Sequence, residues 1–418
     1  MIINKLKAQT KVYATNFNTY IIVKEKVVLA FSGGLDTSYC AIYLSKVLNL
    51  EVHAVLVNTG GFSAEELLEI ENKAKNLGVA SYCCLDETIN YYEKVVKYLV
   101  FGNVLKNNTY PLSVSAERIS QATAIANYVK KVGAKAVAHG STGAGNDQVR
   151  FDAIFNILIP KVQIITPIRD NKLSREQEVT FLKENGIEIN AEKAKYSINK
   201  GFWGTSVGGK ETLTSHSPLP EHAYPSQVTE HTSKDIVLHF EKGELQGIDN
   251  QQFTHPTLAI QALEKLASPY GIGRDIHVGD TIIGIKGRVG FEAAAALITI
   301  KAHHILEKHT LTKLQLIIKD QQAMWYGNWL HEGLFLDPVM RDLECYFAST
   351  QQKVTGKVFV RLSPYLFSIL GIESTHDLMS SKFGSYGEMN NTWTGDDVKG
   401  FTKIMSNQMS IYHQINEL

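Results

Sequence analysis

The stretch Phe31-Ser32-Gly33-Gly34-Leu35-Asp36-Thr37-Ser38 decides the fold of this chain. It follows an apolar, β-branched run, 26–31, that predicts a buried strand, and it opens the segment 37–48, whose apolar residues recur at helical spacing. A helix N-terminus carries unpaired N–H groups and a partial positive charge, and therefore favours a phosphate group. Gly33 and Gly34 let the backbone approach such a ligand closely. The stretch thus predicts a phosphate-binding turn between a strand and a helix.

The polar side chains of this turn suit a nucleotide. Ser32, Thr37 and Ser38 offer hydroxyl groups, and we expect Asp36, which would repel a phosphate, to hold Mg²⁺ or to orient a donor. A simple capped turn is the alternative, but the whole string is far more specific than two glycines. The string is neither a Walker A loop, because the closing Gly-Lys-Ser/Thr is missing, nor a dinucleotide fingerprint.

Strands and helices alternate from residue 26 to residue 189. This alternation predicts an α/β fold with a doubly wound parallel sheet, which binds ligands at the carboxyl ends of its strands where the strand order switches. We expect further strands at 52–57, 81–85, 136–139 and 162–166, and helices at 64–77 and 115–132.

The pattern changes after residue 190, which predicts a second, α+β domain. Residues 200–225 are rich in Gly, Ser, Thr, Pro and His and are expected to form a loop. Residues 236–247 predict a hairpin that turns at Lys242-Gly243, residues 255–266 a helix, and residues 288–306 a Gly-flanked loop that continues as a long helix. The expected order is an N-terminal extension (1–23), a nucleotide-binding domain (24–189), a second domain (190–385) and a C-terminal helical tail (386–418).

The composition narrows the class of protein. A chain of 418 residues favours two domains, and equal numbers of basic and acidic residues, 42 each, give no support to nucleic-acid or membrane-surface binding. The four cysteines form no CxxC pair and suit a reducing compartment, so we expect a cytoplasmic protein. The apolar run 293–300 is too short to span a bilayer, and residues 1–23 lack the organisation of a signal peptide.

A second motif follows the strand expected at 136–139. It reads His139-Gly140-Ser141-Thr142-Gly143-Ala144-Gly145-Asn146-Asp147-Gln148-Val149-Arg150-Phe151. Its polar groups suit a zwitterionic amino acid, because Asp147 can pair with an ammonium group and Arg150 with a carboxylate in forked geometry. The alternative is an Asn/Asp-rich turn with a solvated Arg. A specific string of thirteen residues directly after the expected strand makes this alternative less favourable.

The first motif resembles the pyrophosphate-binding loop of the N-type ATP pyrophosphatases, whose fold is adenine nucleotide α-hydrolase-like. The second resembles the HGxTGxGNDQxRFE segment of the argininosuccinate synthases, and further similarity runs from about residue 26 to residue 371. The resemblance implies that the ureido oxygen of citrulline attacks the α-phosphorus of ATP and releases pyrophosphate. The amine of aspartate then displaces AMP from the citrullyl-adenylate. It also implies Mg²⁺, small-molecule substrates only and a homotetramer.

The resemblance assigns roles to residues that match the family motifs. The implied ATP site consists of Ala30, Phe31, Ser32, Gly33, Gly34, Leu35, Asp36, Thr37, Ser38, Val57 and Gly140. The implied aspartate site consists of Thr142, Asn146 and Asp147. The implied citrulline site consists of Tyr110, Ser115, Asn146, Arg150, Ser197, Ser206 and the aligned positions Gly279 and Phe291, with Arg118 as a neighbour that assists. Ser32, Asp36 and Asp147 are expected to take the most direct part in the reaction, and the sequence assigns no set of metal ligands.

Three positions depart from the family pattern. Ala144 stands where many members carry Lys, and Gly279 and Phe291 align with a Glu and a Tyr that touch citrulline. One interpretation is that Asp280 or Glu292 takes over and that the substrate is free citrulline, the family default. The other is an N-acylated citrulline, such as the acetyl or succinyl derivative, which has no ammonium group to pair.

Two further classes of protein remain as alternatives. Another adenylating enzyme of the superfamily, such as a tRNA-thiolating or asparagine-forming one, would need a reactive cysteine pair and a basic surface, or an amidotransferase cysteine, and the sequence has none of these. A nucleotide-sensing or structural protein would not require both motifs. We therefore expect an enzyme.

Overall fold

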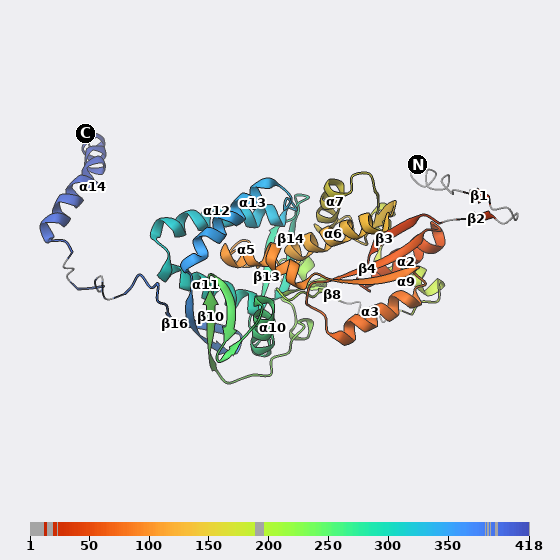
Figure 1. The fold of residues 1–418 in the computed structure, drawn as a ribbon, viewed down its shortest axis with the longest axis horizontal. Helices are drawn as coiled ribbons and strands as arrows, with labels where there is room; N and C mark the ends of the chain where they lie inside the picture. Colours follow the sequence, from red (N-terminus) through yellow and green to blue (C-terminus); the bar gives the residue numbers. More distant parts are fainter. Residues whose placement is uncertain are drawn as a thin grey trace.

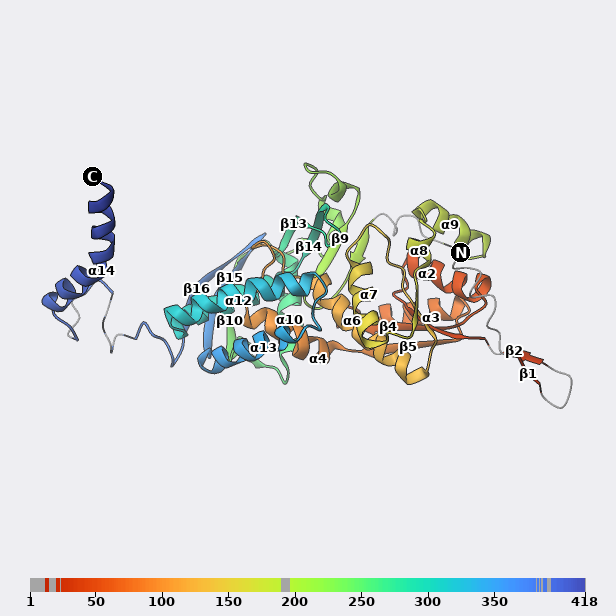
Figure 2. The ribbon, with the colours of Figure 1, turned by 90° about the horizontal axis from the view of Figure 1, so that it is seen from above.

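The computed structural model describes residues 24–188, 196–380, 382, 384, 386–388 and 392–417, and the backbone of 12–14 and 20–22. The described part of the N-terminal extension is an antiparallel pair of strands, β1 (Val12–Ala14) and β2 (Tyr20–Ile22). The boundary expected between residues 189 and 190 lies outside the described residues. Figures 1 and 2 show an elongated molecule with a parallel sheet towards one end and the C-terminal helix at the other.

The nucleotide-binding part contains the expected parallel sheet, in the order β5-β4-β3-β6-β7. The chain builds β3, β4 and β5 outward on one side, then crosses to add β6 and β7 on the other side of β3. The strand order therefore switches between β3 and β6. The strands are β3 (Lys26–Ala30), β4 (Glu51–Asn58), β5 (Ser81–Asp86), β6 (Ala136–Ala138) and β7 (Gln163–Ile165).

Helices cover both faces of this sheet. Successive side chains of β3 point in opposite directions, so the strand contributes to an apolar core on each face. Val27 and Leu29 pack into a core formed with α2 and α9, whereas Val28 packs into a second core formed with α6. The predicted α/β fold is confirmed. The helices are α2 (Leu35–Ile42) with a π-helical turn (Tyr43–Val47), α3 (Ala64–Asn76), α6 (Ser113–Val132), α7 (Asp147–Leu158), α8 (Pro167–Asp170) and α9 (Arg175–Glu184).

The second part contains two antiparallel sheets, in the orders β12-β11-β10-β15-β16 and β13-β14-β9-β8. The predicted hairpin is β10 and β11, and both residues of its Lys242-Gly243 turn have positive φ, as a tight hairpin turn requires. The strands are β8 (Ser197–Asn199), β9 (Thr205–Gly208), β10 (Lys234–Glu241), β11 (Glu244–Ile248), β12 (Gln251–Gln252), β13 (Arg274–Asp280), β14 (Lys286–Glu292), β15 (Gly356–Ser363) and β16 (Leu366–Glu373).

Two loop expectations were wrong in part. Residues 205–208 form β9 inside the expected loop 200–225, and residues 288–292 belong to β14. These strands are short or rich in Gly and polar residues, so they lack the alternation that identifies a strand. The helices of this part are α10 (Pro256–Ala267), α11 (Ala294–Thr310), α12 (Lys313–His331) and α13 (Pro338–Thr350). Three segments of the nucleotide-binding part precede them in the chain, and the last of the three packs on α11 and α13: α4 (Thr88–Tyr91), a π-helical turn (Tyr92–Val96) and α5 (Lys97–Phe101). Short 3₁₀ turns lie at Lys210–Leu213, Glu221–Ala223, Ser268–Tyr270 and Gln351–Lys353.

One continuous core joins the two parts of the molecule. It runs from Val28 and Val55 of the parallel sheet, through Ile125 of α6, to Leu238 and Val358 of the antiparallel sheet. The last helix, α14 (Gly395–Asn416), contributes no buried residue and lies apart from the body in both views (Figures 1 and 2). Within the described ranges, we find no helix with the length and apolar character needed to cross a bilayer.

Candidate active site

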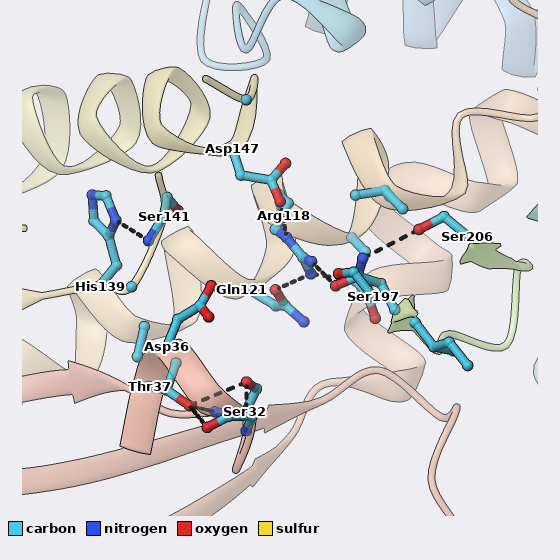
Figure 3. Close-up of a pocket in the computed structure, with 18 of the residues that line it drawn as sticks. Ser32, Asp36, Thr37, Arg118, Gln121, His139, Ser141, Asp147, Ser197 and Ser206 are labelled. Carbon is cyan, nitrogen blue, oxygen red and sulfur yellow. Dashed lines mark hydrogen bonds and ion pairs between the residues drawn. The ribbon is translucent and has the colours of Figure 1, made fainter. Parts of the chain in front are cut away.

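A cleft of about 1020 Å³ lies at the carboxyl ends of β3 and β6, where the strand order switches (Figure 3). The loop after β3 and the loop after β6 touch there. A Cβ atom at Gly140 would lie 3.1 Å from Cβ of Asp36 and 3.3 Å from the backbone nitrogen of Thr37. A side chain at residue 140 would therefore separate the two motifs. Gly33 and Asp147 line the same cleft.

The loop after β3 lines the cleft at the start of α2. Gly33 has a φ of 73°, which lets the chain turn sharply, and its carbonyl accepts a hydrogen bond of 2.5 Å from Nζ of Lys73. No side chain caps α2, so its first N–H groups remain available to an anion. The hydroxyls of Ser32 and Thr37 lie 3.3 Å apart. Lys73 of α3 lines the cleft and supplies a cation that the sequence motifs did not reveal.

Two carboxyl groups meet behind this loop. Asp36 lines the cleft, and Glu178 of α9 lies beside it, buried and with an Oε2 that accepts no hydrogen bond from any described residue. Burial raises the pKa of Asp36. Burial and the neighbouring Asp36 carboxylate raise the pKa of Glu178 to about 8. The pair therefore holds a proton at neutral pH.

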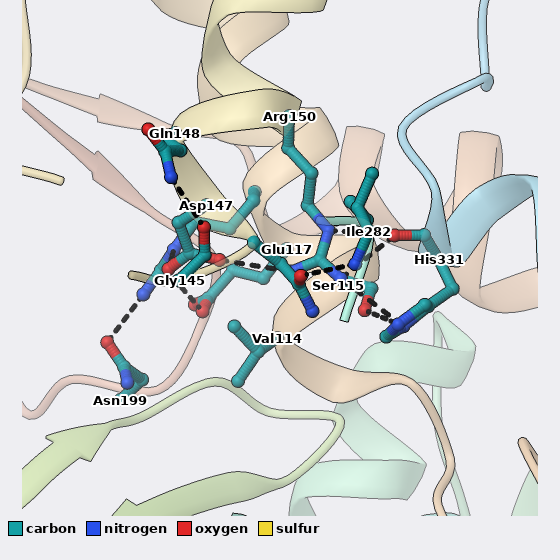
Figure 4. A network of polar contacts seen from close by, with 12 residues as sticks. Val114, Ser115, Glu117, Gly145, Asp147, Gln148, Arg150, Asn199, Ile282 and His331 are labelled. Atoms are coloured by element: carbon teal, nitrogen blue, oxygen red, sulfur yellow. Dashed lines mark hydrogen bonds and ion pairs between the residues drawn. The ribbon is translucent and has the colours of Figure 1, made fainter. Parts of the chain in front are cut away.

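The start of α7 places one carboxylate between two guanidinium groups. Asp147 accepts from Nε of Arg118 at 2.9 Å and from Nη1 of Arg150 at 3.0 Å (Figures 3 and 4). Although burial acts in the opposite direction, these two cations hold the pKa of Asp147 below its ordinary value. The sequence led us to expect separate partners for Asp147 and Arg150. Instead, Asp147 pairs with Arg150, and it also pairs with Arg118.

Segments of the second part close the other side of the cleft. The Asn146 side chain accepts a hydrogen bond of 2.8 Å from the backbone N–H of Ile282, in the turn between β13 and β14 (Figure 4). Asn199 joins the wall in the same way, since its Nδ2 donates to the Ser206 hydroxyl at 3.2 Å and its Oδ1 accepts from Arg118 at 2.5 Å. These contacts fix β8, β9 and the β13–β14 hairpin against the nucleotide-binding part.

His331, the last residue of α12, orients Arg150 and Ser115. Its carbonyl accepts from Nε and Nη2 of Arg150 at 3.0 and 2.9 Å, and its Nδ1 lies 3.2 Å from Nη2 of Arg150 and 3.1 Å from the Ser115 hydroxyl (Figure 4). Burial and the Arg150 guanidinium lower the pKa of His331 to about 3, so the ring is neutral. Because Nδ1 accepts from Arg150, Nε2 carries the proton.

The β13–β14 hairpin contains the two aligned departures from the family pattern. Gly279 lines the cleft, whereas Phe291 is fully buried beneath it, with its ring 5.2 Å from that of Tyr110. Glu292, one candidate replacement for the missing carboxylate, is buried and bound to Arg274 at 2.8 Å. Asp280, the other candidate, lines the cleft but is largely exposed and pairs with Lys286.

The cleft gathers most site residues that the sequence predicted. Those that line it are Ala30, Phe31, Ser32, Gly33, Gly34, Leu35, Asp36, Thr37, Val57, Tyr110, Ser115, Gly140, Thr142, Asn146, Asp147, Arg150, Ser197, Ser206 and Gly279. Two predicted contacts lie elsewhere. Phe291 belongs to the core, and the buried Ser38 donates its hydroxyl hydrogen to the carbonyl of Gly34 at 2.6 Å.

The sequence motifs missed Lys73, His277 and His331, which line the cleft, and Glu178, which lies behind it. They come from helices and strands without a recognisable motif. For Glu178, the only available signal was its position in a helix that follows the last parallel strand.

The arrangement suits activation of a substrate by ATP. It combines an anion-binding turn, a carboxyl pair, a cluster of one carboxylate and two guanidinium groups, and a wall that can position a second and a third ligand. Within the described ranges, no group of three or more His, Cys, Asp and Glu side chains could hold a metal ion by itself. Mg²⁺ commonly uses one or two carboxylates plus substrate phosphates and waters. Asp36 and Glu178, with its uncommitted oxygen, fit that requirement.

Comparison with known proteins identifies the family. A protein-family model described as "Arginosuccinate synthase N-terminal HUP domain" matches residues 26–188. A second family model, described as "Arginosuccinate synthase C-terminal domain", matches residues 196–412. The chain is 36% identical to the argininosuccinate synthase of Dictyoglomus turgidum over 93% of this chain and 98% of that protein. It is 36% identical to that of Methanocaldococcus jannaschii (86% and 91%) and 33% identical to that of Xanthomonas campestris (93% and 98%). The chain belongs to the argininosuccinate synthase family.

Proposed function

We propose that this protein joins L-citrulline to L-aspartate at the expense of ATP, forming argininosuccinate, AMP and pyrophosphate. The observation that carries the proposal is the single cleft in which the loop after β3, the loop after β6 and the wall of the second part meet. A reaction of three substrates through an adenylate requires such a shared site. The same step belongs to the biosynthesis of arginine.

The proposed chemistry follows from the low reactivity of the ureido group of citrulline. The ureido carbon of citrulline is a poor electrophile, so its oxygen first attacks the α-phosphorus of ATP, and pyrophosphate leaves. The amine of aspartate then attacks the carbon of the citrullyl-adenylate, and AMP leaves. No side chain forms a covalent bond. The protein contributes by holding the reacting atoms together and by stabilising the charge that develops at phosphorus.

The loop after β3 is assigned to the phosphates of ATP, with Ser32, Thr37 and the N–H groups of α2 as donors. Lys73, which already fixes the carbonyl of Gly33, adds positive charge. Asp36 and Glu178 would hold Mg²⁺, which when bound neutralises the departing pyrophosphate. Since the pair retains a proton, we expect that proton to leave when the metal arrives. The ribose and base lie against Ala30, Val57 and Gly140.

The two amino acids are assigned to the opposite side of the cleft. Aspartate lies near Thr142, Asn146 and Asp147, whose carboxylate sets the positions of Arg118 and Arg150. Citrulline lies along Tyr110, Ser115, Ser197 and Ser206, with its amino-acid end towards Gly279. Free citrulline is favoured over an N-acylated form because the similar proteins are named argininosuccinate synthases.

Release of pyrophosphate tests this function directly. The purified full-length protein should release pyrophosphate from ATP only when both citrulline and aspartate are present, and argininosuccinate should accumulate in equal amount. Another adenylating enzyme of the superfamily would release pyrophosphate without this double requirement. A nucleotide sensor would bind ATP and release none. Either result would exclude the proposed reaction.

The proposal includes a homotetramer in the cytoplasm. The exposed helix α14 has a stripe of apolar side chains that another copy of the chain could cover. All four cysteines are free, which suits a reducing compartment. The mass of the particle in solution and the position of a tagged protein in the cell test these two points separately.

A further inference from the structure

One side chain in the cleft wall has a polar atom that the fold does not use. His277 of β13 lines the cleft and is 6% exposed. Its Nδ1 is enclosed without a hydrogen-bond partner among the described residues, whereas its Nε2 is the ring nitrogen beside Gly279. Buried polar atoms in native proteins almost always have a partner, so an exception calls for a reason. His331 in the same wall also has an unpartnered ring nitrogen, Nε2, but its Nδ1 is held by Arg150 and Ser115. No hydrogen bond to a described residue orients the ring of His277 in this way.

The place of the His277 ring is set by Gly279. Residues 277 and 279 lie on the same face of β13, and a Cβ atom at residue 279 would lie 2.5 Å from Nε2 of His277. The imidazole therefore stands in the space that a side chain at residue 279 would occupy. It stacks on Tyr110 with the ring centroids 5.3 Å apart. Both Tyr110 and Gly279 belong to the proposed citrulline end of the cleft.

The carboxylates around the citrulline end of the cleft are engaged with cations of the protein, so the group that would accept a hydrogen bond from the substrate ammonium is still to be identified. Glu292 is committed to Arg274, Asp280 to Lys286, and Asp147 to two guanidinium groups. Glu292 and Asp147 are therefore not free to pair with an ammonium group of the substrate, and Asp280 is 70% exposed and pairs with Lys286 at the surface. A neutral imidazole with its proton on the enclosed Nδ1 has a lone pair on Nε2, which can accept a hydrogen bond from an ammonium group.

We propose that His277 binds the α-amino group of citrulline and replaces a carboxylate at residue 279 in recognising the amino-acid end of this substrate. The inference rests on the proposed function and deepens it, because it names the residue that sets the specificity for that end. The interaction is a hydrogen bond from a cation to a neutral ring. It requires the unprotonated imidazole, since a protonated ring would repel the ammonium group.

The surroundings keep the ring in that state. Burial, together with Lys106, lowers the pKa of His277. The titratable and charged groups that act on it come from the loop before α6 (Lys106), from β13 itself (Asp275) and from the end of α12 (His331), and Tyr110 lies on its face. The KM for citrulline should therefore rise when acidification protonates His277.

Steady-state kinetics of variants test the proposal. In His277→Ala, the KM for citrulline should rise about tenfold, as expected for loss of one hydrogen bond to a charged group, while the KM values for ATP and aspartate stay within about twofold. Adding Gly279→Glu to His277→Ala should recover most of the loss, because the carboxylate enters the vacated space. His277→Gln should bind citrulline better than His277→Ala and should lose the rise of KM in acid. His231→Ala, at an exposed loop position, is the control.

Three results would overturn the proposal. One is an unchanged citrulline KM in His277→Ala. Another is an equal rise of all three KM values in both His277→Ala and His277→Gln, which indicates a structural role. The third is a wild-type preference for Nα-acetylcitrulline over citrulline. Failure of the proposed function is distinguishable from these results, because the wild-type protein would then release no pyrophosphate that depends on citrulline.

Discussion

At the scale of single residues, the cleft depends on a missing side chain at Gly140. A methyl group there would lie 3.1 Å from Cβ of Asp36, tighter than ordinary contact, and would move the loop that we assign to the phosphates. In Gly140→Ala, the KM for ATP should therefore rise by about tenfold or more, because displacements of 1 Å in a site are costly. Steady-state pyrophosphate release at varied ATP measures this effect.

Gly143→Ala is the matched control in the same loop. A Cβ at residue 143 meets only Cγ of Arg169, at 3.6 Å, and this glycine does not line the cleft. Its KM for ATP should stay close to that of the wild type. Equal effects of the two substitutions would show that the loop responds to any loss of glycine and not to the contact with Asp36.

The carboxyl pair makes a second prediction at this scale. Since the pKa of Glu178 rises from 4.5 to about 8 on folding, the folded state favours its protonated form. Its contribution to stability is complete below pH 4.5 and is lost as the pH rises through 8. The Tm of the wild type should fall by a few degrees between pH 6 and pH 9. In Glu178→Gln, which stays neutral, this fall should be smaller.

Glu184→Gln, an exposed position on the same helix α9, is the control for Glu178→Gln. It should leave the pH dependence of Tm unchanged. A second measurement addresses the metal. Proton release on addition of Mg²⁺ and ATP should be lower in Glu178→Gln than in the wild type. Identical proton release would mean that the pair does not respond to the metal.

The residues of the candidate site were predictable only where they stand in continuous motifs. The loops after β3 and β6 were recognised because their order and their position after strands are visible in the sequence. Lys73, His277 and His331 were not recognised, since each comes from a different element and only the folded chain brings it to the cleft. Phe291 and Ser38 were predicted to belong to the site because of their positions in sequence motifs. In the structure both side chains are buried in the core.

At the scale of helices and strands, the parallel sheet was predictable and the cleft wall was not. Buried parallel strands are continuous apolar runs, and the central strands β3 and β6 follow that rule. The wall strands β9 and β14 carry Gly and Ser where the cleft needs them, so their pattern indicated loops. Helix α7 begins at Asp147, inside the second motif, for which no helix was predicted from the sequence.

A buried ion pair joins α11 to α12 and should dominate the stability of that pair of helices. Glu307 and Lys319 are both fully buried and 3.0 Å apart, and Asn103 and Gln351 also bind Glu307. Lys319→Met should lower the free energy of unfolding by about 3–5 kcal/mol, because it leaves a buried carboxylate without its cation. Chemical denaturation measures this loss. The activity at 25 °C should persist, since these residues do not line the cleft.

The double variant Glu307→Gln/Lys319→Met separates pairing from packing. It should be more stable than Lys319→Met alone, since no unpaired charge remains. Lys313→Met, exposed at the start of α12, should change the stability by less than about 0.5 kcal/mol. The pair should also weaken in acid. Although burial acts in the opposite direction, His303 and Lys319 hold the pKa of Glu307 below its ordinary value, so its contribution is lost as the pH falls through that pKa.

At the scale of the whole molecule, the shared core explains how two parts of the chain make one site. The apolar cluster that begins under the parallel sheet continues through α6 into the antiparallel sheet, and α6 also carries Ser115 and Arg118 of the cleft. The two walls are therefore held by one packed body. Burial in this body, more than any motif, sets the pKa shifts of the site.

Helix α14 is the exception, because it projects from this body with an apolar stripe exposed. Val398, Phe401, Met405, Tyr412 and Ile415 recur at intervals of three, four, seven and three residues, as in a helix that packs along another helix, and all are about half exposed or more. A second copy of the chain is the partner that we propose. Phe401→Asp/Tyr412→Asp should then reduce the mass of the particle from a tetramer to a smaller species, measured by light scattering on a sizing column.

Ser410→Asp/Gln414→Asp adds the same charge on the opposite face of α14 and should leave the mass unchanged. The two pairs of substitutions differ only in the face that they alter, so a contact along the stripe predicts different masses and a general effect of charge predicts equal ones. If both variants and the wild type have the same mass, the stripe does not join copies of this chain. Because α14 does not line the cleft, Phe401→Asp/Tyr412→Asp should still release pyrophosphate, and its lower Tm would measure what the lost contacts between copies add to stability.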